Sequence, residues 1–376
     1  MINSIRIEVP NMKKLLSVLA LLLVCSLLLC GCAVSTMQLA GTAMEPPKEL
    51  PEISYLRPVY ADAADPAKGL SSMESVQLKE YVVLKGSTKA ISLTGGWYAV
   101  EGTDVTYPAI RCTGDVHLVL TDGSKLTLTG KKYCAGIQVD ENASIQVYAQ
   151  SEGAAMGEIH ATGGSSGAGI GGKKEGKMGA VTLNGGSILS AGKDGGAGIG
   201  GGEDGEGANI TINGGAVTAT GSGGAGIGGG LHASGHHIVI NGGTVTATGG
   251  ENAAGIGGGS AGDGEAITIR GGTVTAMGSL NGAGIGAGGY DRLSQKGGCA
   301  KDISLSGGTV SAVGGENGVG IGHSVNGESS AIRVAAAHTI RAGSTENPET
   351  AVCTNRTDDA DLSADSSFLQ RYVTVK

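Results

Sequence analysis

The chain of 376 residues contains 71 glycines and only 3% aromatic residues, and it carries a formal net charge of −8 at pH 7. A disordered linker could be as rich in glycine, but it would not also be 40% hydrophobic. The acidic balance, with no basic cluster beyond the N-terminus, argues against nucleic acid as a partner. With so few aromatic residues, we expect an interior built from Ile, Val, Leu and Ala.

The N-terminal segment has the pattern of an export signal. Lys13 and Lys14 precede an apolar run that begins at Leu15 and ends at the letters "LCGC", whose last residue is Cys32. These letters resemble the bacterial lipobox, which implies that Cys32 is the lipidated residue. We therefore expect residues 1–32 to be a lipoprotein signal peptide, and the protein to be a membrane-anchored lipoprotein of the bacterial cell surface. An uncleaved membrane anchor and ordinary signal cleavage nearby are the alternatives.

The next segment, residues 33–76, is polar and rich in proline, with Pro46, Pro47, Pro51, Pro58 and Pro66. This composition predicts a flexible stalk between the anchor and a folded domain. From residue 77 onward, short runs such as "VHLVL" and "KLTLTG" alternate apolar and polar residues, which is typical of β-strands.

A repeat then becomes explicit. The letters "GIG" recur at intervals of 28 or 29 residues, with their isoleucines at Ile170, Ile199, Ile227, Ile256 and Ile285. The letters "NGG", at Asn184, Asn213 and Asn241, move in step with them. A fixed period of this length is typical of a solenoid.

One repeat, residues 196–224, contains three short strands, "AGIG", "ANITI" and "AVTAT", separated by glycine-rich corners. Ile210 and Ile212 alternate with Thr211, so one face of the second strand is apolar. The pattern predicts an all-β protein, a single-stranded parallel β-helix with coils of about 29 residues. We place it over residues 77–345, followed by a C-terminal cap segment over residues 346–376. In this register Ile227 stacks between Ile199 and Ile256, and the "GAGIGGG" glycines are structural rather than a phosphate-binding loop.

The same register makes a prediction for two cysteines. When Ile110 is aligned with Ile137, Cys112 and Cys134 are five positions out of register on stacked strands. This offset corresponds to about 15 Å, whereas a disulfide needs Cα atoms within about 7 Å. We therefore predict no Cys112–Cys134 bridge, and the pairing of Cys299 and Cys353 stays open.

The letters "ITINGGTVTATGG" and "GAGIGGG" resemble a repeat of exported bacterial surface proteins that are identified as carbohydrate-binding β-helix domains. The resemblance extends over roughly residues 85–345. It implies the β-helix, export and a glycan as ligand, and it identifies no binding residue.

Catalytic patterns are weak. The letters G-x-S-x-G occur at residues 163–167 and 258–262, as expected by chance in so glycine-rich a chain. We predict that the protein is not an enzyme. A polysaccharide lyase, which would need a calcium-bound carboxylate cluster and a base in one groove, is the less favoured alternative.

Two groups of side chains could hold a metal ion. His232, His236 and His237 lie within six residues of one corner and are suited to zinc or copper. Weak calcium candidates gather in the corners of neighbouring coils: Glu203, Asp204, Glu206 and Asp263. A solvated polar corner is the alternative for both groups, and we otherwise expect no cofactor.

The corner after "GIG" varies most between coils, and its longest version contains Tyr290, Asp291 and Arg292. Variation of this kind often marks the binding face of a solenoid, and these side chains suit a sugar. The other aromatic candidates are Trp97, Tyr98, Tyr107 and Tyr133. We therefore expect a non-catalytic lipoprotein module that binds an extracellular polymer, with carbohydrate favoured. The alternative is a structural adhesin or spacer with a surface protein as partner.

Overall fold

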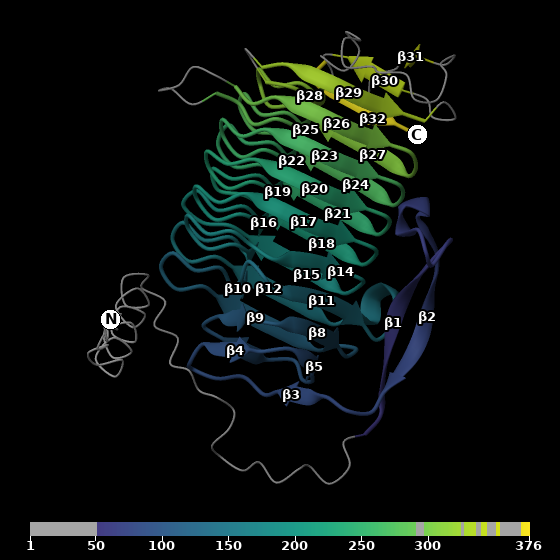
Figure 1. The fold of residues 1–376 in the computed structure, drawn as a ribbon, viewed down its shortest axis with the longest axis vertical. Helices are drawn as coiled ribbons and strands as arrows, with labels where there is room; N and C mark the ends of the chain where they lie inside the picture. The colour runs from purple at the N-terminus through teal and green to yellow at the C-terminus, as the bar shows by residue number, and fades with distance from the viewer. Residues whose placement is uncertain (1–50, 291–296, 325–326, 336–339, 344–350, 354–369) are drawn as a thin grey trace, which may run out of the picture.

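The computed structural model describes residues 51–290, 297–324, 327–335, 340–343, 351–353 and 370–376. Within these residues the chain winds into a rod of stacked coils, and each regular coil contributes one strand to each of three sheets (Figure 1). In the coil predicted from the sequence, the three strands are β16 (Ile199–Gly200), β17 (Gly207–Ile212) and β18 (Ala216–Thr220). The pairing is parallel from coil to coil, so the predicted parallel β-helix is confirmed.

Sheet 1 has nine strands and contains the "GIG" positions. Apart from β16, its strands are β4 (Ile91–Leu93), β7 (Ile110–Cys112), β10 (Ile137–Val139), β13 (Ile170–Gly171), β19 (Ile227–Gly228), β22 (Ile256–Gly257), β25 (Ile285–Gly286) and β28 (Ile321–Gly322).

Sheet 2 has ten strands. Apart from β17, they are β3 (Val82–Leu84), β5 (Gly96–Val100), β8 (Asp115–Leu120), β11 (Ser144–Ala149), β14 (Ala180–Leu183), β20 (Gly235–Ile240), β23 (Gly264–Ile269), β26 (Ala300–Leu305) and β29 (Ser329–Val334).

Sheet 3 has eleven strands, of which eight are parallel. Apart from β18, the parallel strands are β6 (Val105–Tyr107), β9 (Lys125–Thr129), β12 (Glu158–Thr162), β15 (Ser187–Ala191), β21 (Thr244–Thr248), β24 (Thr273–Met277) and β27 (Thr309–Val313). The sheet ends with three antiparallel strands, β32 (Tyr372–Val375), β30 (Ile340–Gly343) and β31 (Ala351–Cys353).

The antiparallel strands change the predicted boundaries slightly. The last parallel strand ends at Val334, so β30 already belongs to the terminal structure although we expected the β-helix to reach residue 345. β32 lies inside the expected cap segment, and it pairs with the last parallel strand of sheet 3, β27. It therefore covers part of the open edge that the end of a solenoid exposes.

The interior consists of columns of aliphatic side chains. Ile227 is fully buried and pairs in register with Ile199 below and Ile256 above, as predicted. Ile210 and Ile212 are buried, whereas Thr218 is exposed on sheet 3. Alternation along each strand thus directs one set of side chains into the core and the other toward solvent.

The glycines of sheet 1 are required by close backbone contact. Gly228 has a φ of +136°, and a Cβ atom built there would lie 2.0 Å from the carbonyl oxygen of Gly257 on the next coil. Gly200 meets the same obstacle from Gly228 at 1.9 Å. Because no larger residue fits this column, these glycines are structural, as the repeat indicated.

The stacked coils also explain the "NGG" corners. The side-chain amide of Asn213 donates to Asn184 at 2.7 Å, and that of Asn241 donates to Asn213 at 2.8 Å. Arg270 occupies the same position one coil further on and donates to Asn241 at 3.2 Å. The corner asparagines therefore form a ladder of side-chain hydrogen bonds that runs along the rod.

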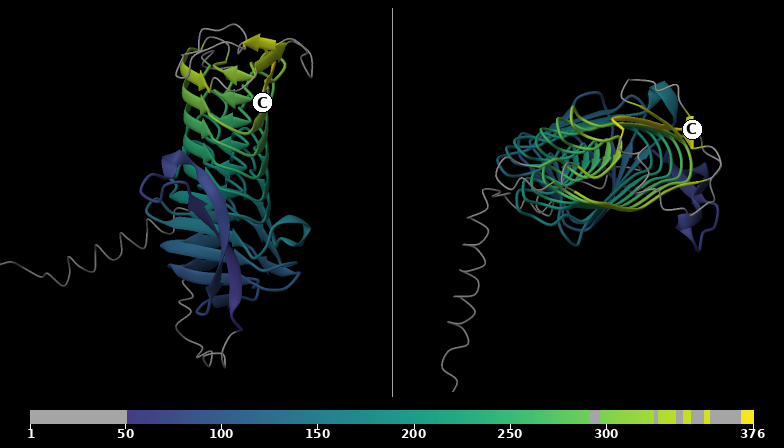
Figure 2. Two further views of the ribbon diagram at one scale, coloured as in Figure 1. Left: turned by 90° about the vertical axis from the view of Figure 1, so that its right-hand side faces the viewer. Right: turned by 90° about the horizontal axis from the view of Figure 1, so that it is seen from above.

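The N-terminal part of the described chain differs from the flexible stalk expected over residues 33–76. β1 (Ile53–Tyr60) and β2 (Leu70–Leu78) form an antiparallel hairpin, and a short 3₁₀ turn, Pro66–Lys68, lies in the loop between them. The hairpin lies lengthwise along the outside of the rod (Figure 2). Residues 33–50 lie outside the described residues.

The hairpin is held because its apolar face covers apolar side chains on the outer face of sheet 2. Ile53, Tyr55 and Leu78 form one buried cluster with residues of three rod strands, Ala99, Val119 and Tyr148. The Tyr55 ring lies 4.8 Å from Trp97 and 4.9 Å from Tyr148, measured between centroids. The free energy gained by burying these side chains exceeds the conformational entropy lost when this proline-rich segment becomes ordered.

The two cysteines of the early coils behave as predicted. Ile137 pairs with Ile110 and Val139 pairs with Cys112, which is the alignment used above. Cys112 is a free, fully buried thiol, so it forms no bridge with Cys134. Burial raises the pKa of the Cys112 thiol far above its ordinary value, and the nearby charge of Asp140 adds to this effect.

Candidate polar binding site

The outer face of sheet 1 changes character along the rod. From β13 onward, the second position of each strand is a glycine, at Gly171, Gly200, Gly228 and their successors. In the three earlier coils the same register position carries Ser92, Arg111 and Gln138. Polar side chains therefore cover the start of the sheet, just before the long glycine-rich corners begin.

A recess of about 410 Å³ lies at this junction. We call it the polar recess, and its lining comprises Arg111, Thr113, Gln138, Val139, Asp140, Glu141, Asn142, Ala143, Lys173, Gly176 and Lys177. One wall of the recess is the corner between β13 and β14, residues 172–179, which contains Lys173 and Lys177. It is the first of the long corners along the rod. Because the preceding coil makes a much tighter turn after β10, the long corner projects beyond it and leaves a hollow.

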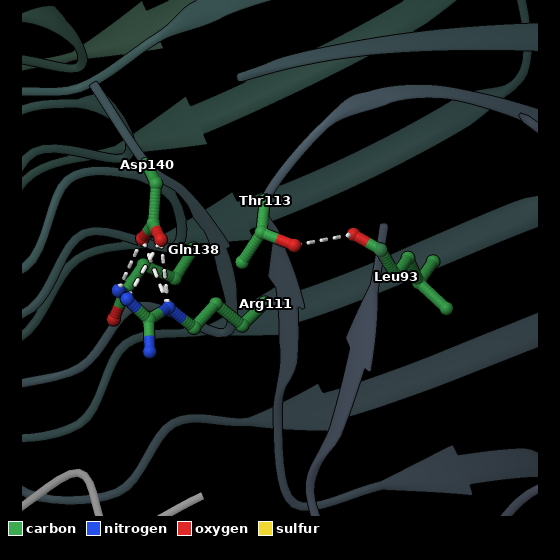
Figure 3. A network of polar contacts seen from close by, with 5 residues as sticks. All are labelled: Leu93, Arg111, Thr113, Gln138 and Asp140. Carbon is green, nitrogen blue, oxygen red and sulfur yellow. Dashed lines mark hydrogen bonds and ion pairs between the residues drawn. The ribbon is translucent and has the colours of Figure 1, made fainter. Parts of the chain in front are cut away.

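An ion pair organises the floor of the recess (Figure 3). The Arg111 Nε atom lies 3.0 Å and 2.8 Å from the two carboxylate oxygens of Asp140, and Arg111 Nη2 lies 2.7 Å from Oδ2. The Gln138 side chain, which is 5% exposed, donates to Oδ1 of Asp140 at 2.9 Å. These charge-assisted contacts hold the planar groups in fixed orientations.

The groups of this network remain accessible. The side chains of Arg111 and Asp140 are 31% and 26% exposed. At the rim, Lys177 lies 3.3 Å from Glu141. With Lys173, the recess contains three cationic and two anionic side chains, so it is locally positive in a protein that is acidic overall.

An exposed aromatic ring lies beside the same corner. The backbone N–H of Lys174 donates to the carbonyl of Tyr133 at 3.0 Å, which joins the corner to the coil below. The Tyr133 side chain is 37% exposed, and Lys132 Nζ lies 4.7 Å from the centre of its ring. Lys174 Nζ lies 5.9 Å from the same centre, so the exposed ring lies outside the lining of the recess, next to the corner that forms its wall, with two ammonium groups near it.

The ligand candidates predicted from the sequence are dispersed. Trp97 is half-buried under the hairpin, stacked on His117 with 4.3 Å between ring centroids. Tyr98 is buried in the rod interior and donates to the carbonyl of Gly95 at 3.1 Å. Tyr290 is half-buried, while Asp291 and Arg292 lie outside the described residues. The described candidates therefore do not converge on one exposed surface.

The calcium candidates contact basic or backbone groups, and Lys174 lies near both Glu203 and Asp204. Glu203 pairs with Lys174 at 3.0 Å, Asp204 contacts His232 at 3.1 Å, and Asp263 accepts a hydrogen bond from the Cys299 N–H at 2.7 Å. Glu206 lies 3.4 Å from His236. A hydrogen bond from Ser166, together with Lys174, lowers the pKa of Glu203. In the part of the chain that the structure describes, no group of three or more His, Cys, Asp or Glu side chains is arranged to hold a metal ion.

Sequence reasoning missed Arg111, Gln138 and Asp140. The available signal was the replacement of "GIG" by "AIRC" and "GIQV" in the early coils, where charged or amide side chains stand at a position that later coils keep as glycine. The alignment of Ile110 with Ile137 already put Asp140 one coil above Arg111, but only the structure shows that the two side chains meet.

Comparison with known proteins gives one match, to a family model described as a beta helix repeat, over residues 210–231, 238–260 and 267–289. Neither the curated proteins nor the solved structures contain a match to this chain. Among the described residues, no helix has the length and apolar character needed to cross a membrane. The matched segments lie within three of the regular coils, so this part of the chain is similar to the beta helix repeat, in agreement with the parallel β-helix of the structure.

Proposed function

We propose that this protein is a lipid-anchored module of the bacterial cell surface that binds an extracellular carbohydrate without altering it. β-Helix repeats are compatible with carbohydrate binding. The observation that carries the proposal is the polar recess, a hollow in which planar hydrogen-bonding groups are held in fixed orientations. The exposed ring of Tyr133 lies on the neighbouring side of the corner that forms its wall.

The chemistry of the recess suits a sugar. Arg111 and Asp140 present a guanidinium and a carboxylate edge, which together can donate to and accept from neighbouring hydroxyl groups. Tyr133 can cover the apolar face of a sugar ring at the side of the recess. Because the recess has an excess of positive charge, we expect a preference for glycans that carry carboxylate groups.

Glycan-array binding by the protein without residues 1–32 tests this proposal, with Tyr133→Ala compared in parallel. We expect selective binding to acidic glycans and a weaker signal from the variant. Equal signals from neutral and acidic glycans would remove the charge argument. The lyase alternative makes a different prediction, namely the appearance of shortened, unsaturated sugar products during incubation.

Anchoring is tested separately. The letters "LCGC" support lipidation at Cys32, a residue outside the described part of the chain. Cys32→Ala should leave the precursor unprocessed or release the protein from the membrane, with the β-helix unaffected. Cell fractionation and the size of the precursor are the measurements, and an unchanged membrane fraction together with unchanged size would contradict the lipobox interpretation.

A further inference from the structure

The rings of two adjacent histidines on β20 meet because the second of them, His237, has a left-handed backbone. In a regular strand, consecutive side chains alternate between the two faces. Here His236 pairs with Ala208 on the coil below and Ile238 pairs with Ile210, while His237 is passed over in the ladder and has a φ of +54°. The residue opposite it, Asn209, is passed over in the same way with a φ of +56°, so this is a left-handed kink that the coils share. A left-handed residue interrupts the alternation of side chains along the strand.

At this kink two ring nitrogens lie close together. The Nδ1 atoms of His236 and His237 lie 2.8 Å apart, and the two rings are inclined at 77°. The other nitrogen of His236, Nε2, lies 3.4 Å from a carboxylate oxygen of Glu206. When Nε2 carries the proton and donates to Glu206, the lone pair of His236 Nδ1 faces His237. A carboxylate behind an imidazole is the common outer partner of a metal-binding histidine.

We propose that His236 and His237 form a surface binding site for a divalent transition-metal ion that prefers right-angled coordination, with Cu²⁺ favoured over Zn²⁺. At metal–nitrogen distances of about 2.0 Å, nitrogens 2.8 Å apart subtend an angle of about 90° at the metal. This angle fits tetragonal Cu²⁺ or Ni²⁺. A tetrahedral Zn²⁺ ion would need the nitrogens about 3.3 Å apart.

The two imidazoles are the only protein ligands of the proposed site, and water supplies the remaining coordination positions. Binding uses two neutral imidazoles, so the proton shared between the Nδ1 atoms moves through solvent to Nε2 of His237. No other group changes its protonation in this step.

The repeat supplies variants that preserve the fold. His236→Ala and His237→Asn reproduce Ala208 and Asn209 of the coil below, and Asn209 adopts the same left-handed backbone with a φ of +56°. The matched control is His232→Ala, which reproduces the residue of the next coil, Ala261, also with a left-handed backbone.

Calorimetric titration with Cu²⁺, Ni²⁺ and Zn²⁺, after alkylation of accessible thiols, measures the site, and electron paramagnetic resonance identifies the Cu²⁺ ligands. We expect one Cu²⁺ with imidazole nitrogen ligands, bound at least about tenfold more weakly by either His236→Ala or His237→Asn. His232→Ala should bind Cu²⁺ as the unmodified protein does. A variant that combines His236→Ala with His237→Asn and still binds Cu²⁺ with unchanged affinity would overturn the proposal. Tighter binding of Zn²⁺ than of Cu²⁺ by the unmodified protein would also overturn it.

Discussion

Replacement of Tyr55 by alanine should release the hairpin from the rod while leaving the coils folded. Tyr55 is only 6% exposed, and its ring contacts Trp97 and Tyr148. Burial of a tyrosine side chain removes about 150–250 Å² from water, which corresponds to about 4–6 kcal/mol at about 25 cal/mol per Å². An alanine at this position still buries its own methyl group, so the expected loss of docking free energy is smaller, about 3–5 kcal/mol. Since an isolated two-stranded hairpin is marginally stable, docking should not survive this loss.

The assay is direct because Trp97 is the sole tryptophan of the chain and lies beneath the hairpin. Tyr55→Ala should shift the fluorescence emission of Trp97 to longer wavelength. It should also speed trypsin cleavage after Lys68 in the hairpin loop, because the side chain is already exposed and the backbone is no longer held against the rod. Far-ultraviolet circular dichroism of the rod should stay unchanged. The control is Arg57→Ala, an exposed position two residues further along the same strand, where the ion pair with Glu74 is lost. Identical emission and proteolysis of the two variants would refute hairpin docking through this cluster.

Two further outcomes follow from the fold. Ile227→Ala should lower the free energy of unfolding by about 2–5 kcal/mol, because the fully buried side chain is stacked between rigid neighbours; Thr218→Ser, on the exposed face, should change it by under about 0.5 kcal/mol. Thermal melts that show equal tolerance at both sites would mean that the coil register is wrong. Burial raises the pKa of Tyr81, in the hairpin cluster, to about 12. Its contribution to docking is therefore complete below pH 10 and is lost as the pH rises toward 12, and Trp97 emission that stays constant up to pH 12 would contradict this.

The regular coils could be predicted from the sequence because every position in them repeats the same physical demand. Ile227 must fill a column of the core, and Gly228 must leave room for the carbonyl of the next coil. Each requirement recurs after 28 or 29 residues, so the register follows from the repeat alone.

The hairpin and the polar recess could not be predicted in the same way. The alternation of Ile53 and Tyr55 was visible, but nothing local indicated that the outer face of sheet 2 would be apolar enough to cover it. The recess combines Arg111, Asp140 and Lys173 from three successive coils that depart from the consensus. The sequence shows that these residues differ from the consensus. It does not show how close they lie, because this distance depends on the length of each coil and the path of each corner.

The affinity of the protein for an acidic glycan, measured by calorimetry before and after Arg111→Gln, tests the central claim most directly. The substitution removes the guanidinium that faces Asp140 in the polar recess. Because a hydrogen bond to a charged group contributes about 1.5–3 kcal/mol, we expect the affinity to fall by at least about tenfold. Lys301→Gln, an equal change of charge on the exposed face of sheet 2, should leave it unchanged. An Arg111→Gln variant that is folded and binds the glycan with undiminished affinity would contradict the assignment of the polar recess as the carbohydrate site.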